Sequence, residues 1–144
     1  MRTLDPRDMR YRPDYDNSND SDDPLVAQGI NYHQGPEWLW PTSYFLRARL
    51  IFLHNYIKTR AGQPSELTHA LRTVYHELHA HMVNLKHHIS NSAFAGLPEL
   101  TNHNGSYCRD SCETQAWSSG CLLMALHEMA RLESVVHDAL AQIN

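Results

Sequence analysis

The sequence predicts an all-α protein with long irregular segments, and three observations support this fold class. Apolar side chains recur at helical spacing over residues 42–60, 65–88 and 112–144. No stretch shows the alternation typical of a strand, and no repeat of fixed period is present. About 20 or more polar, Pro-containing residues precede both the first and the last helical stretch, and connections of that length tend to carry function. We expect one domain, in which residues 1–41 form an irregular arm and loop that lead into the helices.

The stretch 42–60 carries two neighbouring apolar stripes. The first consists of Phe45, Ala48, Phe52 and Tyr56, and the second consists of Leu46, Leu50, Leu53 and Ile57. An apolar arc of this width predicts a helix that is buried on more than one side. Gly62 and Pro64 mark the end of this helix and the start of the next.

The stretch 65–88 carries a single apolar face. Its members are Leu67, Leu71, Val74, Leu78, Met82 and Leu85. The opposite side carries histidines and charged residues, so we expect this helix to lie outside the first. The last helix is predicted to begin at about Cys112, with Ser111 as its N-cap and Glu113 in its first turn.

Composition excludes several classes of function. The net charge of −4 and the lack of a Lys/Arg cluster disfavour nucleic-acid binding. No apolar run approaches the length of a membrane span, and the first residues do not resemble a signal peptide. The three cysteines fall in one late segment, which does not resemble a disulfide framework. We therefore expect a cytoplasmic protein that binds neither nucleic acid nor membrane.

The N-terminal arm admits two interpretations. Residues 1–28 contain seven Asp, no Glu and three Pro, a composition that is compatible with a disordered tail. The alternative is a structured segment that wraps a neighbouring element, in which Asp5-Pro6 and Tyr15-Asp16-Asn17 would form turns and contacts.

The aromatic stretch Asn31–Pro41 is the most unusual part of the chain. It combines two Trp, a Tyr and a His with neutral polar side chains, between a Gly-Pro pair and a second Pro. The prolines disfavour a helix or a central strand and favour a loop. Flat rings beside hydrogen-bonding groups suit a sugar, although a hydrophobic plug between helices is the other possibility.

The eleven histidines raise the possibility of a metal site, which their spacing does not support. His76 and His127 begin like a zinc-binding helix motif, but the second ligand is missing four residues later. Cys108, Cys112 and His103 lack a matching second pair of ligands. We expect neither a metal nor another cofactor, and a small zinc-stabilised helical protein is the weakest of three interpretations.

Three blocks of the sequence, read together, closely resemble one protein family. They are Asn31–Pro41 running into Tyr44–Ala48, then Gly96–Asn102, and then Tyr107-Cys108 followed by Ser111–Ser118. Their order and spacing resemble the C-terminal end of the eukaryotic glycogen debranching enzymes. The resemblance weakens between residues 58 and 95 and after about residue 126.

The resemblance implies a bifunctional enzyme. In this family one domain is a 4-α-glucanotransferase, and a C-terminal α/α toroid hydrolyses the remaining α-1,6-linked glucose as an amylo-α-1,6-glucosidase. The resemblance also implies that Glu99 is the catalytic base. Without it, Glu99 would be interpreted as a residue that caps the chain or pairs with a cation. Glu37 is the second choice for the base.

The remaining site predictions concern substrate binding. They are His33, Gln34, Glu37, Trp38 and Trp40, and, as weaker candidates, Gln115 and Trp117. The family's general acid falls upstream of the matched part, so we expect this chain to be a fragment or truncated relative that is inactive alone and acts with the rest of a debranching enzyme on branched α-glucan. A non-catalytic glycogen-binding or partner module is the competing hypothesis.

Overall fold

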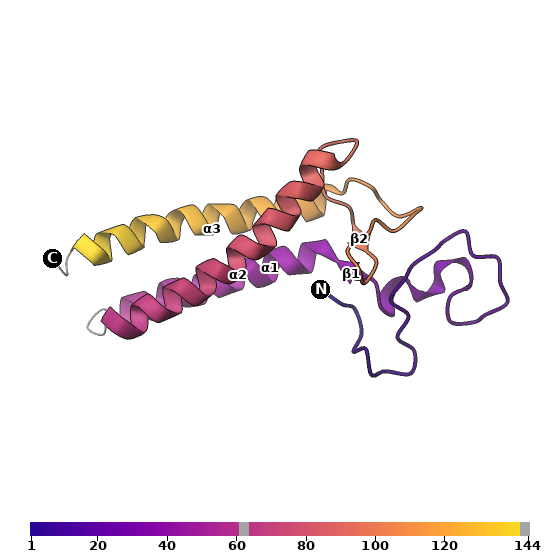
Figure 1. Cartoon of the computed structure of the whole chain (residues 1–144), viewed down its shortest axis with the longest axis horizontal. Coiled ribbons are helices and arrows are strands. Elements are labelled where there is room, and N and C mark those ends of the chain that lie inside the picture. The colour runs from indigo at the N-terminus through magenta and orange to yellow at the C-terminus, as the bar shows by residue number, and fades with distance from the viewer. Residues whose placement is uncertain (61–63, 142–144) are drawn as a thin grey trace.

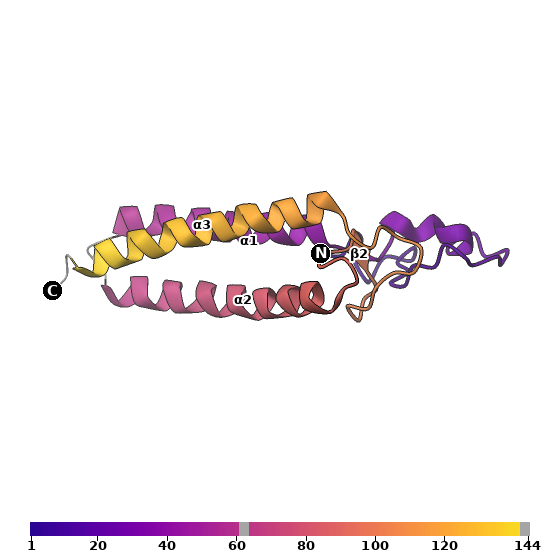
Figure 2. The ribbon, with the colours of Figure 1, turned by 90° about the horizontal axis from the view of Figure 1, so that it is seen from above.

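The chain is mostly helical, and its loops gather at one end of three long helices (Figure 1). The computed structural model describes residues 1–60 and 64–141, except for the side chains of residues 60, 64–68, 71, 75 and 135–141. The elements are the 3-10 helix η1 (Ala27–His33), strand β1 (Glu37–Trp38), helix α1 (Leu39–Arg60), helix α2 (Pro64–Asn91), strand β2 (Leu100–Thr101) and helix α3 (Ala116–Ala141). Helices α1 and α3 run in the same direction, and α2, which lies between them in the sequence, runs in the opposite direction (Figures 1 and 2). The first turns of α1 and α3 therefore both lie at the loop end.

The main core lies between the three helices. Its buried members are Leu46, Leu50, Leu53, Ile57, Val74, Leu78, Ala125 and Leu132. The second predicted stripe of α1 is thus confirmed as buried. The prediction that α1 is buried on more than one side is wrong, because Phe45 is 46% exposed and Phe52 is 73% exposed. Within the described chain, α2 and α3 cover only one side of this helix.

The apolar face of α2 behaves as predicted where its side chains are described. Val74, Leu78 and Leu85 are buried, whereas Leu67 and Leu71 lie outside the described side chains. The opposite face is exposed to solvent and carries His69, His76, His79 and His87, whereas His81 is exposed at the edge of the apolar face, beside Leu85.

The predicted helix starts need correction. Helix α1 begins at Leu39, three residues before the predicted start at Thr42, and so contains Pro41 in its first turn. Proline is compatible with that position because the first N–H groups of a helix have no acceptor within it. Helix α3 begins at Ala116 rather than Cys112. Ser111 is not its N-cap, because the Ser111 hydroxyl donates to the Cys108 carbonyl (2.8 Å).

The N-terminal arm wraps around the aromatic stretch. The side-chain amide of Asn31 donates to the carbonyls of Arg12 (3.1 Å) and Asp14 (2.7 Å). The Tyr15 side chain is buried, and its backbone N–H donates to Asn102 Oδ1 (2.9 Å). Of the two interpretations of the arm, the structured one agrees with these contacts.

A two-stranded antiparallel sheet joins the aromatic stretch to the segment after α2, where the sequence predicts no strand. Glu37 pairs with Thr101, and Trp38 pairs with Leu100. Each strand is two residues long, which is too short for an alternating pattern to be visible in the sequence. No helix in the described residues combines the length and the hydropathy needed to span a membrane.

Candidate functional site

Glu99 lies at a junction where the chain is fixed on both sides. Its backbone N–H donates to the Cys112 carbonyl (2.9 Å), and its carbonyl accepts from the backbone N–H of Leu39 (3.2 Å). The two preceding residues, Leu97 and Pro98, are fully buried. The half-buried carboxylate therefore projects from a backbone that is tied to α1 and to the segment before α3.

Two side chains from other elements contact the Glu99 carboxylate. The amide nitrogen of Gln115, the residue just before α3, donates to Glu99 Oε1 (2.8 Å). Burial, followed by the hydrogen bond with Glu99, raises the pKa of the Tyr32 phenol above its ordinary value, at which the hydroxyl already keeps its proton at neutral pH. The carboxylate thus faces two neutral hydrogen-bond donors.

Tyr32 belongs to an aromatic cluster that consists of Tyr15, Tyr32, His33 and Trp38. Tyr32 makes edge contacts with Tyr15 (centroid distance 5.4 Å) and with Trp38 (5.1 Å). The imidazole of His33 stacks on Trp38 at 5.0 Å with an interplanar angle of 21°. The Trp38 indole N–H donates to the Tyr32 carbonyl (3.3 Å), which fixes the ring against the cluster. The structure therefore brings His33 and Trp38 close to the partner of Glu99.

Trp40 and Trp117 form a stacked pair at the start of α1 and α3. Their ring centroids are 4.3 Å apart, and the planes differ by 9°. Trp117 is 50% exposed, so part of this pair faces solvent. The indole N–H of Trp40 is buried and has no hydrogen-bond partner among the described residues. These two candidates, far apart in the sequence, do meet in space.

Glu37 and Gln34 have their contacts elsewhere. Successive residues of a strand point to opposite faces, so the Glu37 side chain leaves β1 on the side opposite to Trp38. Its carboxylate forms an ion pair with Arg2 (3.3 Å). The side-chain oxygen of Gln34 is buried without a hydrogen-bond partner among the described residues, beside a small cavity that includes Ile30. No contact connects either side chain with Glu99.

The cysteines and His103 also have separate contacts. Cys108 is buried, its thiol lies 2.9 Å from Asn102 Oδ1, and burial raises its pKa to about 12. His103 Nδ1 lies 2.9 Å from Asp14 Oδ1. Cys112 is exposed, whereas Cys108 and Cys121 are buried. In the described part of the chain, no three His, Cys, Asp or Glu side chains converge as metal ligands would.

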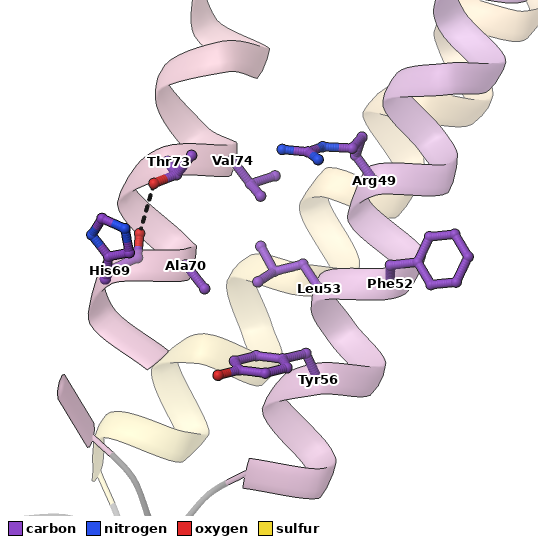
Figure 3. A pocket seen from close by; sticks show the side chains of 8 residues that line it. All are labelled: Arg49, Phe52, Leu53, Tyr56, His69, Ala70, Thr73 and Val74. Carbon is purple, nitrogen blue, oxygen red and sulfur yellow. Dashed lines mark hydrogen bonds between the residues drawn. The ribbon is translucent and has the colours of Figure 1, made fainter. Parts of the chain in front are cut away.

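A further cavity lies away from Glu99. It has a volume of about 580 Å³ and opens between α1 and α2, where Leu53 faces Ala70 and Val74 while Phe52 points away (Figure 3). None of the residues that line it belongs to the candidate site. The described lining of the cavity is mainly apolar and includes no carboxylate, so these residues lack the groups that glycosidic hydrolysis requires.

Two contributors to the site were not predicted from the sequence. Tyr32 lies within the aromatic stretch, but nothing in its spacing distinguishes it from the neighbouring rings. Ser118 is fully buried and donates a hydrogen bond to the Gln115 side-chain oxygen (3.2 Å). Its position three residues after Gln115, on the first turn of α3, could have suggested this contact once the helix start was known.

Comparison with known proteins identifies the family. The family model described as amylo-alpha-1,6-glucosidase matches residues 1–124. The glycogen debranching enzyme of Saccharomyces cerevisiae is 46% identical over 134 residues. That match covers 90% of this chain but 8% of the yeast protein, so the chain spans less than a tenth of the length of this relative. By its sequence, then, the chain belongs to the amylo-alpha-1,6-glucosidase family of glycogen debranching enzymes.

Proposed function

We propose that this chain supplies part of an amylo-α-1,6-glucosidase active site, in which Glu99 is the general base. The observation that carries the proposal is the fixed position of the Glu99 carboxylate. Its backbone is bonded on both sides, and Gln115 and Tyr32 contact the side chain from two other elements. A carboxylate held in this way can aim a water molecule at a reacting carbon.

The chemistry of α-1,6 hydrolysis assigns Glu99 one of two carboxyl roles. In an inverting mechanism, one carboxylic acid protonates the leaving oxygen, and a carboxylate on the opposite face removes a proton from the attacking water. A carboxylate has about four acceptor positions, so two contacts with protein leave room for that water. The acid would lie about 6.5–9.5 Å from Glu99, and we propose that it comes from outside these 144 residues.

The proposed substrate is a branched α-glucan such as a glycogen limit dextrin. Sugar C–H faces stack on indole rings, and the half-exposed Trp117, stacked on Trp40, offers such a surface beside the start of α3. His33 and Trp38 are proposed to shape the side of the glucose pocket near Tyr32. The same proposal places the helices in an α/α toroid of a cytoplasmic enzyme, and the 4-α-glucanotransferase site of that enzyme lies in a different domain, outside these 144 residues.

The direct test uses a chimera. The matching segment of the yeast debranching enzyme is replaced by this chain, and glucose release from a limit dextrin is compared with glucanotransferase activity. We expect Glu99→Gln to lower glucose release by about 10²- to 10⁴-fold, the usual contribution of a general base, and to leave transfer unchanged. Glu133→Gln, at an exposed position on α3, is the matched control. Full glucose release by the Glu99→Gln chimera would overturn the proposal.

A second variant separates the two candidate carboxylates. Glu37→Gln removes the ion pair with Arg2 but leaves the contacts of Glu99 in place. Because exposed ion pairs contribute little, we expect a change of less than about threefold in glucose release. A loss as large as that expected for Glu99→Gln would transfer the role of base to Glu37.

The alternative function is a glucan-binding module without chemistry, which the solvent-exposed Trp117 favours. The isolated chain would then be retained on a glycogen column, and Trp117→Ala would abolish retention. Phe52→Ala is the matched control, because Phe52 is also an exposed aromatic residue but lies on a different helix, α1. Retention together with a chimera that releases no glucose would favour this function over the proposed one. In either case we expect no glucose release from the isolated chain.

A further inference from the structure

Gln115 is held by the protein through both its backbone and its side chain. Its backbone N–H donates to the Leu97 carbonyl (2.8 Å), which ties the start of α3 to the segment that carries Glu99. Its side-chain nitrogen donates to Glu99 Oε1 (2.8 Å), and its side-chain oxygen accepts from the Ser118 hydroxyl (3.2 Å). Both polar atoms of the amide therefore already have a partner in the protein.

The Glu99 carboxylate determines which way the Gln115 amide points, and the Ser118 hydroxyl holds the other end of the amide. A carboxylate can only accept hydrogen bonds, so the nitrogen of the amide must face Glu99. Ser118 is fully buried, and a buried hydroxyl is costly unless it is hydrogen-bonded. Its bond to the amide oxygen holds the side chain of Gln115 in the place where the nitrogen reaches the carboxylate.

Resting on the proposed role of Glu99, we propose that Gln115 and Ser118 are positioning residues. Ser118 anchors the amide, and the amide holds the Glu99 carboxylate at the angle at which it takes a proton from water. Neither residue needs to touch the substrate. This role differs from the substrate contact expected of Gln115 from the sequence, and it accounts for a buried serine on the first turn of α3.

The chimera allows the two roles of Gln115 to be separated by kinetics. Gln115→Leu keeps the shape of the side chain and removes the donor to a charged acceptor, so we expect kcat for glucose release to fall about 10- to 100-fold. A positioning residue changes kcat and leaves KM within about twofold, whereas loss of a substrate contact raises KM. A raised KM with unchanged kcat would overturn the inference.

Ser118 provides an independent test, because it acts only through Gln115. Ser118→Ala removes the neutral hydrogen bond, and we expect kcat to fall about 3- to 10-fold. Ser118→Thr keeps the hydroxyl and should restore kcat to within about twofold of the parent. In the background of Gln115→Leu, Ser118→Ala should have no further effect, since the group that Ser118 anchors is gone. Equal losses for the Ala and Thr variants, or additive losses in the double variant, would contradict the relay.

The outcomes distinguish this inference from the proposed function. Full glucose release by the Glu99→Gln chimera would refute the function and the inference together. If Glu99→Gln abolishes glucose release but Gln115→Leu and Ser118→Ala leave kcat unchanged, only the inference fails. Glucanotransferase activity, which depends on another site of the chimera, shows whether each variant is folded. Should Gln115→Leu not fold, the comparison of Ala with Thr at Ser118 decides the question.

Discussion

Replacing Gly35 with alanine is expected to detach the N-terminal arm from the aromatic stretch. A Cβ atom at Gly35 would lie 2.0 Å from the Arg12 carbonyl oxygen and 2.4 Å from its carbon. Carbon atoms pack at about 3.5–4.0 Å, so the two segments must separate by about 1 Å or more. The obstructing atoms belong to the backbone, and no change of side-chain rotamer relieves the overlap.

The magnitude follows from the hydrogen bonds at this contact. The Arg12 backbone N–H donates to the Gln34 carbonyl (2.7 Å), the Asn31 amide donates to the Arg12 carbonyl (3.1 Å), and the Gly35 N–H donates to Thr3 Oγ1 (2.8 Å). At about 0.5–1.5 kcal/mol each, their loss destabilises the docked arm by roughly 1.5–4.5 kcal/mol. With about 1.4 kcal/mol for each factor of ten, the open population rises by about tenfold to a thousandfold.

Limited proteolysis with chymotrypsin measures this change. Tyr15 is buried while the arm is docked, so the rate of cleavage after Tyr15 follows the open population. We expect Gly35→Ala to raise that rate by at least about tenfold. Gly120→Ala is the matched control, because open space surrounds this position on α3 and alanine favours a helix by about 1 kcal/mol. Equal cleavage rates in Gly35→Ala, Gly120→Ala and the parent chain would refute the reasoning.

Three further predictions concern the packing and the thiols. Alanine substitutions of Trp40 and Trp117 should show a coupling free energy of about 0.5–1.5 kcal/mol, because the two rings stack. A double-mutant cycle monitored by urea unfolding measures this coupling, and additive effects of the two substitutions would contradict it. Leu46→Ala should lower the free energy of unfolding by about 2–5 kcal/mol in the same assay, since the Leu46 side chain is 1% exposed. A change near zero would mean that the core is packed differently. Iodoacetamide at about pH 8 should label Cys112 before Cys108, because the buried thiol of Cys108 has a pKa raised to about 12 and stays protonated at that pH. Mass spectrometry gives the order of labelling, and the reverse order would contradict the burial of Cys108.

The sequence predicted the helices better than their ends. The buried stripe of α1 could be inferred because periodic burial leaves a local pattern that any three-turn window displays. The start of α3 could not, since it depends on the bond between Gln115 and the Leu97 carbonyl, which joins segments that are separated in the sequence. Ser111 has the local features of an N-cap, but its hydroxyl caps the turn that begins at Cys108 instead.

The site shows the same division. Glu99 was predicted from the resemblance to the family, and the surroundings that the structure gives it include Gln115 and Tyr32. Its role as a base stays a prediction. Glu37 was grouped with Trp38 because the two are adjacent in sequence, yet strand β1 sends neighbouring side chains to opposite faces. Only knowledge of the two-residue sheet would have separated them, and a sheet this short leaves no signal in the sequence.

The hydrogen bond between Tyr15 and Asn102 joins residues that are 87 positions apart, and this separation has a consequence for folding during synthesis. Ribosomes add about 5–20 residues per second, so the arm waits roughly 4–17 s for its partner to be made. During that interval the helical hairpin of α1 and α2 can form from local contacts, whereas the rings of the aromatic cluster have no sheet to pack on. The segment with the densest aromatic content therefore stays uncovered until residue 102 has been made, and a nascent chain that stalls before that point would present it to chaperones or to other unfolded chains.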